Sequence, residues 1–405
     1  MHKLIKLSGI IFVIVIFQTS VIAQDSSRRK LAQPIADTGF KPSGRLWGYA
    51  FGDYAYKQHS DALNRGGSNQ YTGVEQGRNE FQFRRIYLGY NYDITRKFSA
   101  EMLLAAEDNT TTSAGTTSGD LLQDNKLTYY IKLANLRWKN IWKGTDLVIG
   151  QSATPAFPLL SEVIWGYRSI ERTVSDIRRT PSYDMGAALQ GKFDAKGSFG
   201  YNLMVGNGTS AKPESDKFKW FYGDVFAKFF DQKLVFDFYA DYERLNWNPT
   251  WHHSRNMVKG FIAYTTPAIT LGVEAFINHG KNDVVASNST MKDTTSANAK
   301  AISAYIRGRI VKNRLGFFVR MDNYNPDAQY DNSTFTSYKG FTSNYDPSNK
   351  EMFVTAGLDF TPAANVHIMP NVWYNRYTTQ LANQTGTNYR DYDLVYRITF
   401  YYIYR

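Results

Sequence analysis

The sequence predicts an all-β fold, an antiparallel transmembrane β-barrel of about 16 strands with short periplasmic turns and long extracellular loops. Polar and apolar residues alternate through most of the chain after residue 44, which includes most of its 29 Tyr, 26 Phe and 8 Trp. A secretory pattern opens the chain, and no later stretch of about 18 apolar residues could form a spanning helix. The expected turns alternate between short and long, as they do in outer-membrane barrels.

The first 23 residues have the pattern of a cleaved signal peptide. Their start is basic, residues 7–17 are apolar, and the expected cleavage follows Ala23. A transmembrane anchor is the alternative, but the apolar core is short for a span and polar sequence follows at once. We therefore expect residues 24–44 to be a periplasmic N-terminal segment and residues 45–405 to form the barrel.

Composition excludes several functional classes. Without residues 1–23 the chain has 45 Lys and Arg against 36 Asp and Glu, a net charge of +9 that is spread along the sequence. No basic block, zinc spacing or RNA-binding motif supports nucleic acid as a partner. The absence of Cys excludes disulfides and thiolate metal sites.

Strand-like segments follow one another in pairs from residue 45 to the C-terminus. Within most pairs the connection is only a few residues long, as at residues 95–97 and 312–313. The expected strands are residues 45–57, 80–94, 98–107, 125–139, 145–154, 183–194, 198–205, 218–230, 234–246, 255–265, 269–278, 300–311, 314–322, 351–361, 366–377 and 392–404.

Long polar segments join one pair to the next. The expected external loops are residues 58–79, 108–124, 155–181, 279–299 and 323–350. An even strand count with all long loops at one end suits a barrel that closes every backbone edge and is exported through the membrane. A soluble β-sandwich, the alternative class, gives no reason for loops to be sorted in this way.

The alternation separates apolar from charged side chains. In residues 234–241 an aliphatic and aromatic face opposes Asp237 and Asp241, and in residues 301–310 the isoleucines oppose Arg307 and Arg309. Lipid outside and water inside require this arrangement, although aromatic residues favour any sheet. The charged residues expected on the pore wall are Arg85, Lys132, Asp237, Asp241, Lys259, Glu274, Arg307, Arg309 and Arg397, with Asp359 in the same kind of position.

Three segments resemble the phosphate-selective porin O and P family and its Bacteroidetes-type outer-membrane relatives. They are Arg84-Arg85-Ile86-Tyr87-Leu88-Gly89, the region of Glu171-Arg172, and Pro181 to Lys192. The resemblance implies a trimeric porin in the outer membrane of a Gram-negative cell. It also implies that the loop after the fifth strand, here residues 155–181, folds inward as the constriction.

The inward loop is charged but close to balanced. The constriction residues expected from it are Arg168, Glu171, Arg172, Asp176, Arg178 and Arg179, and Glu162 brings the loop to a net charge of only +1. This mixture departs from the basic constriction of phosphate-selecting members, and the C-terminal Tyr404-Arg405 departs from the usual aromatic end. The arginines either attract anions at the narrowest point or pair with the loop's acids and brace it; a helix over residues 170–177 would place Arg172 one turn from Asp176.

The resulting hypothesis is a passive diffusion channel for small hydrophilic solutes, with a weak to moderate preference for anions, phosphate-like ions among them. Its expected partners are outer-membrane lipid and small anionic or polar solutes. An enzyme is not expected, because five histidines remain after residue 23 and no nucleotide-binding or metal motif accompanies them; no cofactor or metal is expected either. The adjacent His252-His253 is expected in a solvated external loop without a carboxylate pattern nearby. The alternative function is a surface binding or adhesion barrel that acts through its long loops.

Overall fold

The structure is a computed structural model in which residues 40–405 form one compact unit. It describes residues 39–66, 70–107, 128–288, 292–330, 337–340 and 346–404. The expected signal peptide, most of the expected N-terminal segment and the expected loop over residues 108–124 lie outside the described residues.

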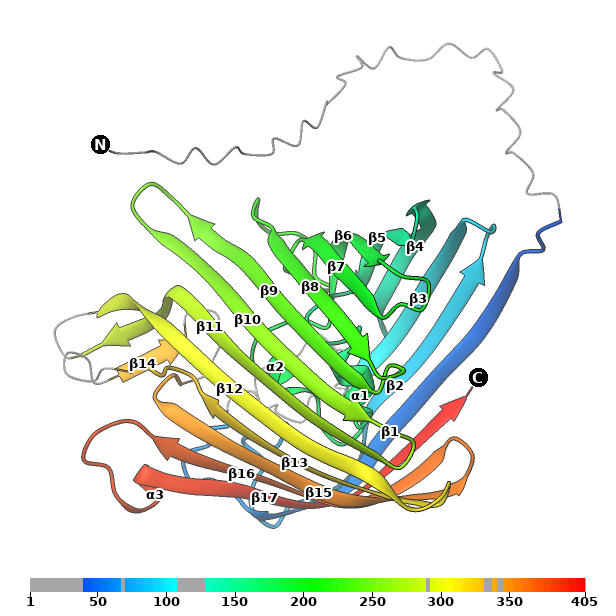
Figure 1. Cartoon of the computed structure of the whole chain (residues 1–405). Helices are drawn as coiled ribbons and strands as arrows, with labels where there is room; N and C mark the ends of the chain where they lie inside the picture. The colour runs from blue at the N-terminus through cyan, green and yellow to red at the C-terminus, as the bar shows by residue number, and fades with distance from the viewer. Residues whose placement is uncertain are drawn as a thin grey trace. The chain divides into compact units, whose positions relative to one another are not determined.

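Sixteen strands form a closed antiparallel barrel, as the sequence predicts (Figure 1). The ring closes because β1 pairs on one side with β2 and on the other with β17; Tyr49, for example, lies between Tyr87 and Ile403. The barrel strands are β1 (Ser43–His59), β2 (Asn79–Asp93), β3 (Phe98–Glu107), β4 (Tyr130–Trp142), β5 (Thr145–Ala153), β6 (Tyr183–Lys192), β7 (Phe199–Gly206), β8 (Trp220–Phe229), β9 (Leu234–Trp247), β10 (His252–Thr265), β11 (Ile269–Ser287), β12 (Lys292–Val311), β13 (Leu315–Asn325), β15 (Asn349–Ala363), β16 (Val366–Thr379) and β17 (Arg390–Tyr404).

The tight turns lie at the end of the barrel where β1 begins and β17 ends. Asn140, Asn313 and Asn365 adopt positive φ at this end (52°, 58° and 65°), which asparagine tolerates better than most residues. Gly144 also has positive φ, and a Cβ there would lie 2.4 Å from the carbonyl oxygen of Lys192. The turn between β4 and β5 is Lys143-Gly144, later than expected, because β4 runs to Trp142.

Two expected external loops are partly strand. β11 continues to Ser287 and β12 begins at Lys292, so most of the segment expected as a loop over residues 279–299 is an extended hairpin. A short strand, β14 (Ser337–Gly340), pairs with residues 284–287 of β11 within the segment expected as the loop 323–350. The expectation of irregular loops here was wrong, because the alternation of β11 continues far enough for Val284 and Ala286 to be buried.

The two faces of the barrel differ as the alternation requires. In β9, Asp237 and Asp241 are buried on the inner face, whereas Phe236 and Phe238 on the outer face are 40% and 54% exposed. The same inner polar and outer apolar pattern continues around the ring, where exposed Leu, Ile, Val, Phe and Tyr side chains face outward.

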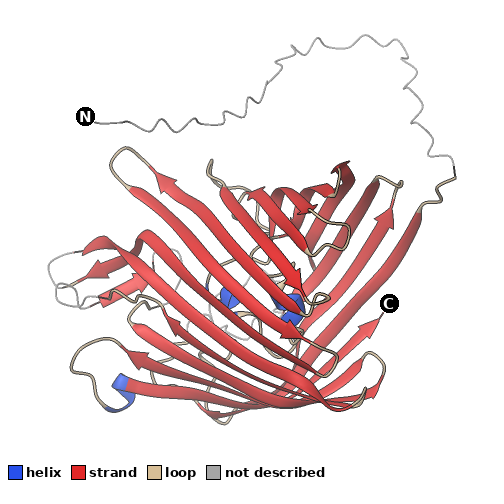
Figure 2. Ribbon diagram, viewed as in Figure 1, coloured by secondary structure: helices blue, strands red, loops and turns tan. Residues whose placement is uncertain are grey.

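Helix contributes little (Figure 2). The described residues include three helices, α1 (Ser161–Trp165), α2 (Val174–Arg178) and α3 (Gly386–Tyr389). Among the described residues, none of the helices is long and apolar enough to cross a membrane. α1 and α2 belong to the segment between β5 and β6, the expected inward loop.

Candidate functional site

Residues 154–182, here called the inner loop, connect β5 to β6 and contact strands on the other side of the barrel. The loop ends are joined where Thr154 Oγ1 donates a hydrogen bond to Pro181 O (2.7 Å). Trp165 and Ile170 are buried in a hydrophobic cluster with inner-face residues of β10, β12, β13 and β16. These partners are Phe261, Ala263, Tyr305, Phe318 and Met369. Two apolar side chains therefore hold the loop against strands distant from its own stems.

Four arginines of the barrel donate hydrogen bonds to backbone carbonyls of the inner loop. They come from β2, β12, β13 and β17 and reach four carbonyls between residues 164 and 172. The pairs are Arg84 with Ser169 O, Arg307 with Ile164 O (3.0 Å), Arg320 with Arg172 O (2.5 Å) and Arg397 with Ile170 O (3.0 Å). Asp53 balances two of these cations, since its Oδ2 lies 2.5 Å from Arg84 Nε and 3.7 Å from Arg397 Nη1.

Arg178 and Arg179, at the end of α2, reach in the opposite direction, from the loop to the barrel. Arg178 forms a bidentate pair with Glu351 of β15, with N to O distances of 2.8 and 2.7 Å. Arg179 Nη1 lies 2.5 Å from Asp241 Oδ2 of β9, and its Nη2 lies 3.7 Å from Glu243. Both arginine side chains are nearly buried, so each pair contributes to holding the loop in place.

Arg168 and Arg172 pair mainly within the loop. Arg168 contacts Glu162 and lies 2.8 Å from Asp176, and Arg172 lies 4.0 Å from Asp176 and 3.6 Å from Glu171. Their side chains keep 14% and 25% of their surface exposed, against 8% and 3% for Arg178 and Arg179. The helix begins at Val174 rather than at residue 170, but Arg172 and Asp176 still approach each other as the expected spacing requires.

The two glutamates of the loop have opposite environments. Glu171 accepts a hydrogen bond from Trp373 Nε1 (3.0 Å). Burial acts to raise its pKa, but Arg172, Arg84 and Arg397 outweigh burial and lower the pKa to about 2. Burial raises the pKa of Glu162 above its ordinary value even though Arg168 opposes the shift. Glu171 therefore keeps its charge on acidification, whereas Glu162 is the first of the two to lose it.

A cavity of about 430 Å³ lies between the inner loop and the barrel, towards the long loops. Six cations line it, Arg85, Lys132, Arg168, Arg172, Arg179 and Arg255, against the acids Glu107, Asp176 and Glu243. Four further carboxylates that pair with these cations, Glu162, Glu171, Asp241 and Asp283, do not line the cavity. The cationic side chains of these ion pairs therefore line the cavity, whereas several of their carboxylate partners lie outside its lining.

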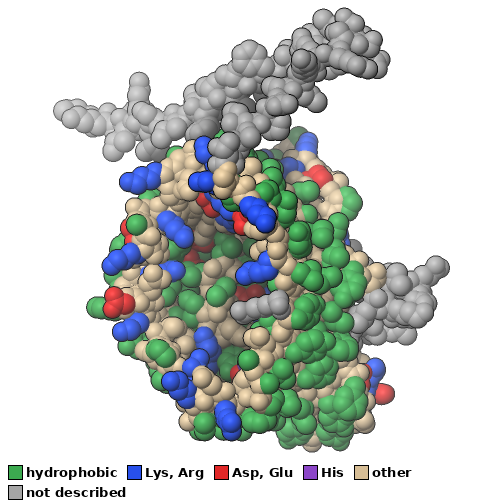
Figure 3. Space-filling model, turned by 90° about the vertical axis from the view of Figure 1, so that its right-hand side faces the viewer, with side chains coloured by type: hydrophobic (Ala, Val, Ile, Leu, Met, Phe, Trp, Pro, Cys, Tyr) green, Lys and Arg blue, Asp and Glu red, His purple; other side chains and the backbone are tan. Residues whose placement is uncertain are grey.

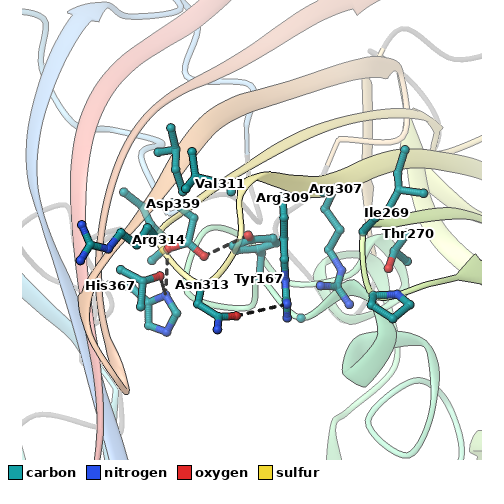
Figure 4. A pocket seen from close by; sticks show the side chains of 18 of the residues that line it. Tyr167, Ile269, Thr270, Arg307, Arg309, Val311, Asn313, Arg314, Asp359 and His367 are labelled. Atoms are coloured by element: carbon teal, nitrogen blue, oxygen red, sulfur yellow. Dashed lines mark hydrogen bonds and ion pairs between the residues drawn. The ribbon is translucent and has the colours of Figure 1, made fainter.

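A second cavity of about 840 Å³ lies on the other side of the loop, at the end with the tight turns (Figure 4). Arg307, Arg309 and Arg314 line it, and Asp359 is its only acidic residue among those described. Asp359 accepts hydrogen bonds from Tyr167 Oη (3.0 Å) and His367 Nδ1 (2.8 Å). In Figure 3 the molecule is hollowed at this end, and Lys and Arg side chains gather around the hollow.

The structure separates the expected pore-wall residues into three groups. Arg85 and Lys132 line the smaller cavity beside Glu107, while Arg307 and Arg309 line the larger one. Arg397 is buried where it holds the loop. The remaining residues are buried in contacts with one another or with the loop. Lys259 lies 3.2 Å from Asp237 and 3.8 Å from Glu274. Glu274 accepts a hydrogen bond from Ser175 Oγ (2.8 Å) of the loop, and Asp241 pairs with Arg179 of the loop.

Several residues that hold the inner loop were not singled out from the sequence. Arg320 and Glu351 lie on inner faces, where the alternation of their strands could have placed them. Arg84 sits at an irregularity in the pairing of β1 with β2, so that both it and Arg85 face inward, which simple alternation does not predict. Trp165 and Ile170 were also missed, since aromatic and aliphatic residues are frequent throughout this chain.

Histidines and carboxylates do not assemble a metal centre within the described part of the chain. His252 and His253 belong to β10 rather than to a loop, and His253 Nε2 lies 2.8 Å from Asp283, so the expectation of a solvated pair without a carboxylate nearby was wrong. The extension of β10 and β11 beyond the expected limits brings these two residues together. The contact between His253 and Asp283 is an ion pair or hydrogen bond within the barrel wall, and it does not bring together three metal ligands among the described residues.

No protein-family model matches the sequence, and no curated protein matches it. Solved structures do match the fold. The outer membrane channel DcaP of Acinetobacter baumannii aligns with a TM-score of 0.62 at 10% identity, covering 90% of this chain and 97% of that one. An anion-selective porin from Comamonas acidovorans gives 0.57 at 9% identity (90% and 100%), and OmpF of Salmonella typhi gives 0.57 at 9% identity (89% and 97%). The chain therefore has the fold of outer-membrane porins.

Proposed function

We propose that this protein is an outer-membrane porin, a passive diffusion channel for small hydrophilic solutes. The observation that carries the proposal is a closed barrel with a polar interior, crossed by an inner loop that has a cavity on each side. The loop is the constriction, and solutes pass between it and the β2 to β4 side of the barrel, where Arg85, Glu107 and Lys132 line the smaller cavity. No chemical step is involved, since passage is limited by size and by the field of the lining charges.

Charge supports a weak to moderate preference for anions. Cations outnumber acids among the described residues lining each cavity. The preference stays modest because each of the six cations of the smaller cavity has a carboxylate partner within 4.0 Å. Phosphate-like anions are included as solutes, because arginine N–H groups donate well to phosphate oxygens. A cleaved signal peptide, which the N-terminal sequence predicts, and a homotrimer, which the resemblance implies, belong to the same proposal.

Current across a planar lipid bilayer tests the proposal. Purified protein, checked for folding by heat-modifiable migration, should give stable channels, and a salt gradient should give a reversal potential of the sign for anion preference. Replacing chloride by phosphate at equal ionic strength would test for phosphate-like solutes. Absence of conductance would overturn the channel, and a cation-selective reversal potential would overturn the anion preference.

A second candidate, a surface binding or adhesion barrel, is favoured by one observation. The hairpin of β11 and β12 extends past the barrel and is joined by β14, which makes an ordered β-structure at the extracellular end. Deleting residues 282–296 tests this candidate. If the protein is a porin, the deletion variant should conduct as the unchanged protein does. If the protein acts only through this surface, it should bind its target through these residues and conduct poorly both before and after the deletion.

A further inference from the structure

One row of residues crosses the outer face of the barrel from β10 to β17. Strand register places these residues opposite one another, and buried inner-face neighbours such as Met257, Glu351 and Asp391 show that the row points outward. In order around the barrel the row is Val258, Ile277, Lys300, Asn325, Lys350, Thr378 and Arg390, where Asn325 and Lys350 directly adjoin the last pair of β13 and β15, Tyr324 with Glu351. All seven line one groove of about 720 Å³ on the outside of the barrel.

Cations gather around Thr378 in this row. Lys350 and Arg390 are its cross-strand partners on the two sides, and Arg376 lies two residues before it on β16. Arg376 is therefore a diagonal neighbour of both other cations, at a spacing of about 7–8 Å between backbones. Arg376 Nε is buried without a hydrogen-bond acceptor among the described residues. Three cationic side chains thus surround one hydroxyl, and at least one donor there is unused.

No acid on the outer face compensates this charge within the described residues of the groove. Among the described residues of the lining Glu351 is the only acidic one, and its carboxylate is on the inner face, bound to Arg178. Lys300, Lys350, Arg376 and Arg390 have no ion pair among the described residues. An uncompensated cluster of cations favours an anionic ligand.

Apart from Asn323, Asn325 and Thr378, the rest of the groove is mostly apolar. Val258, Ile277 and Ile302 are 46%, 55% and 48% exposed, and Met352 lies beside Arg376 across the strand pair. Lys350, Arg376 and Arg390 lie at the extracellular ends of β15, β16 and β17, whereas Lys300 lies within the longer strand β12. Apolar outer-face residues continue from them towards the tight turns. On β1 and β2 the corresponding ends carry Tyr54, Tyr56 and Phe81 instead.

We propose that this groove binds a phosphate-bearing lipid of the outer leaflet. Lys350, Arg376 and Arg390 hold a headgroup phosphate, Lys300 holds further negative charge two strands away, and acyl chains lie over Val258, Ile277 and Ile302. Lysine and arginine at a membrane surface attract anionic headgroups, and their stems lie readily along apolar surface. A second copy of this chain is a poorer occupant, because it would bury four cations that lack partners. The inference rests on the outer-membrane placement in the proposed function and not on conduction.

Native mass spectrometry of the purified, folded protein tests this assignment. The probes are lipid A, which carries phosphates and acyl chains, phosphatidylcholine as a zwitterionic lipid, and inorganic phosphate as competitor. We expect the protein to retain lipid A in preference to phosphatidylcholine, and lipid A to stay bound in the presence of millimolar inorganic phosphate. The variant K350Q/R376Q/R390Q should retain at least about tenfold less lipid A than the unchanged protein. The variant K192Q/K196Q/K233Q removes the same charge at the tight turns and should bind as the unchanged protein does.

Equal retention by both triple variants would overturn the proposal. So would displacement of the lipid by inorganic phosphate, which would make the groove a site for a free anion. Absence of lipid together with dissociation of an oligomer in K350Q/R376Q/R390Q would assign the groove to a second copy of the chain. Bilayer recordings separate this test from that of the proposed function. Loss of lipid binding with unchanged conductance would contradict the lipid site alone, whereas loss of conductance with lipid still bound would contradict the channel alone.

Discussion

Two pairs of arginines in the inner loop have different surroundings although they lie only a few residues apart. Arg178 and Arg179 are nearly buried and pair with Glu351 and Asp241 of the barrel. Arg168 and Arg172 pair within the loop and line the smaller cavity. The first pair therefore fixes where the loop lies, and in the proposed channel the second would set the charge that a solute meets.

The largest effect is expected from removing the pair that fixes the loop. In R178Q/R179Q, Glu351 and Asp241 lose their cationic partners, and breaking a buried ion pair of this kind costs about 3–5 kcal/mol. The loop should loosen, so single-channel conductance and current noise should rise and the temperature of heat-modifiable unfolding should fall. Conductance equal to that of the unchanged protein would show that the hydrophobic contacts of Trp165 and Ile170 hold the loop without these arginines.

The matched variant R168Q/R172Q removes the same charge from the other pair. Conductance should stay near that of the unchanged protein, because the loop keeps its contacts with the barrel. The anion-to-cation permeability ratio should fall by about two- to fivefold, since one unit charge about 4 Å away in water contributes roughly 1 kcal/mol. Reversal potentials under a salt gradient measure the ratio. If both double variants changed conductance and selectivity alike, the distinction between the two pairs would be lost.

The sequence predicts the barrel well because alternation is a local signal with a period of two residues. It cannot distinguish the two arginine pairs, since their partners are distant: Glu351 lies 173 residues from Arg178, and Asp241 lies 62 from Arg179. Nor does it reveal that wall arginines such as Arg320 bind carbonyls of the loop, because a backbone acceptor leaves no mark in the side-chain pattern. The extension of β11 was missed because its Asn and Asp residues favour loops until β14 supplies a partner.

Acidification should change selectivity before it loosens the loop. Burial raises the pKa of Glu162 above its ordinary value of 4.5, so this group loses its charge as the pH falls towards 4.5. Arg168 then keeps Asp176 as its carboxylate partner among the described residues. The pKa of Glu171 is lowered to about 2, so the stability that its charge contributes is fully present above pH 4.5 and is lost as the pH falls through about 2. Anion preference should therefore rise between pH 7 and 4.5, by up to about threefold for one unit charge, while current noise stays constant.

The variant E162Q is the control for that pH range. It should show the higher anion preference already at pH 7, and its reversal potential should vary little down to pH 4.5. A rise in selectivity of the same size in E162Q would assign the titration to another carboxylate along the path, with Glu107 and Asp176 of the smaller cavity as the nearest choices.

The smallest effect is expected at the other cavity, where Arg309 is exposed and its side chain contacts Asn313 at 3.5 Å. Water and salt screen a charge in this position, and at physiological ionic strength the Debye length is about 8 Å. R309Q should therefore lower the anion-to-cation permeability ratio by less than about twofold in 0.15 M salt and by more in dilute salt. Arg168 and Arg172 are less exposed, so R168Q/R172Q should lower the permeability ratio by more than R309Q does at both salt concentrations. An equal or larger effect of R309Q in 0.15 M salt would move the selectivity-determining region from the inner loop to the periplasmic mouth.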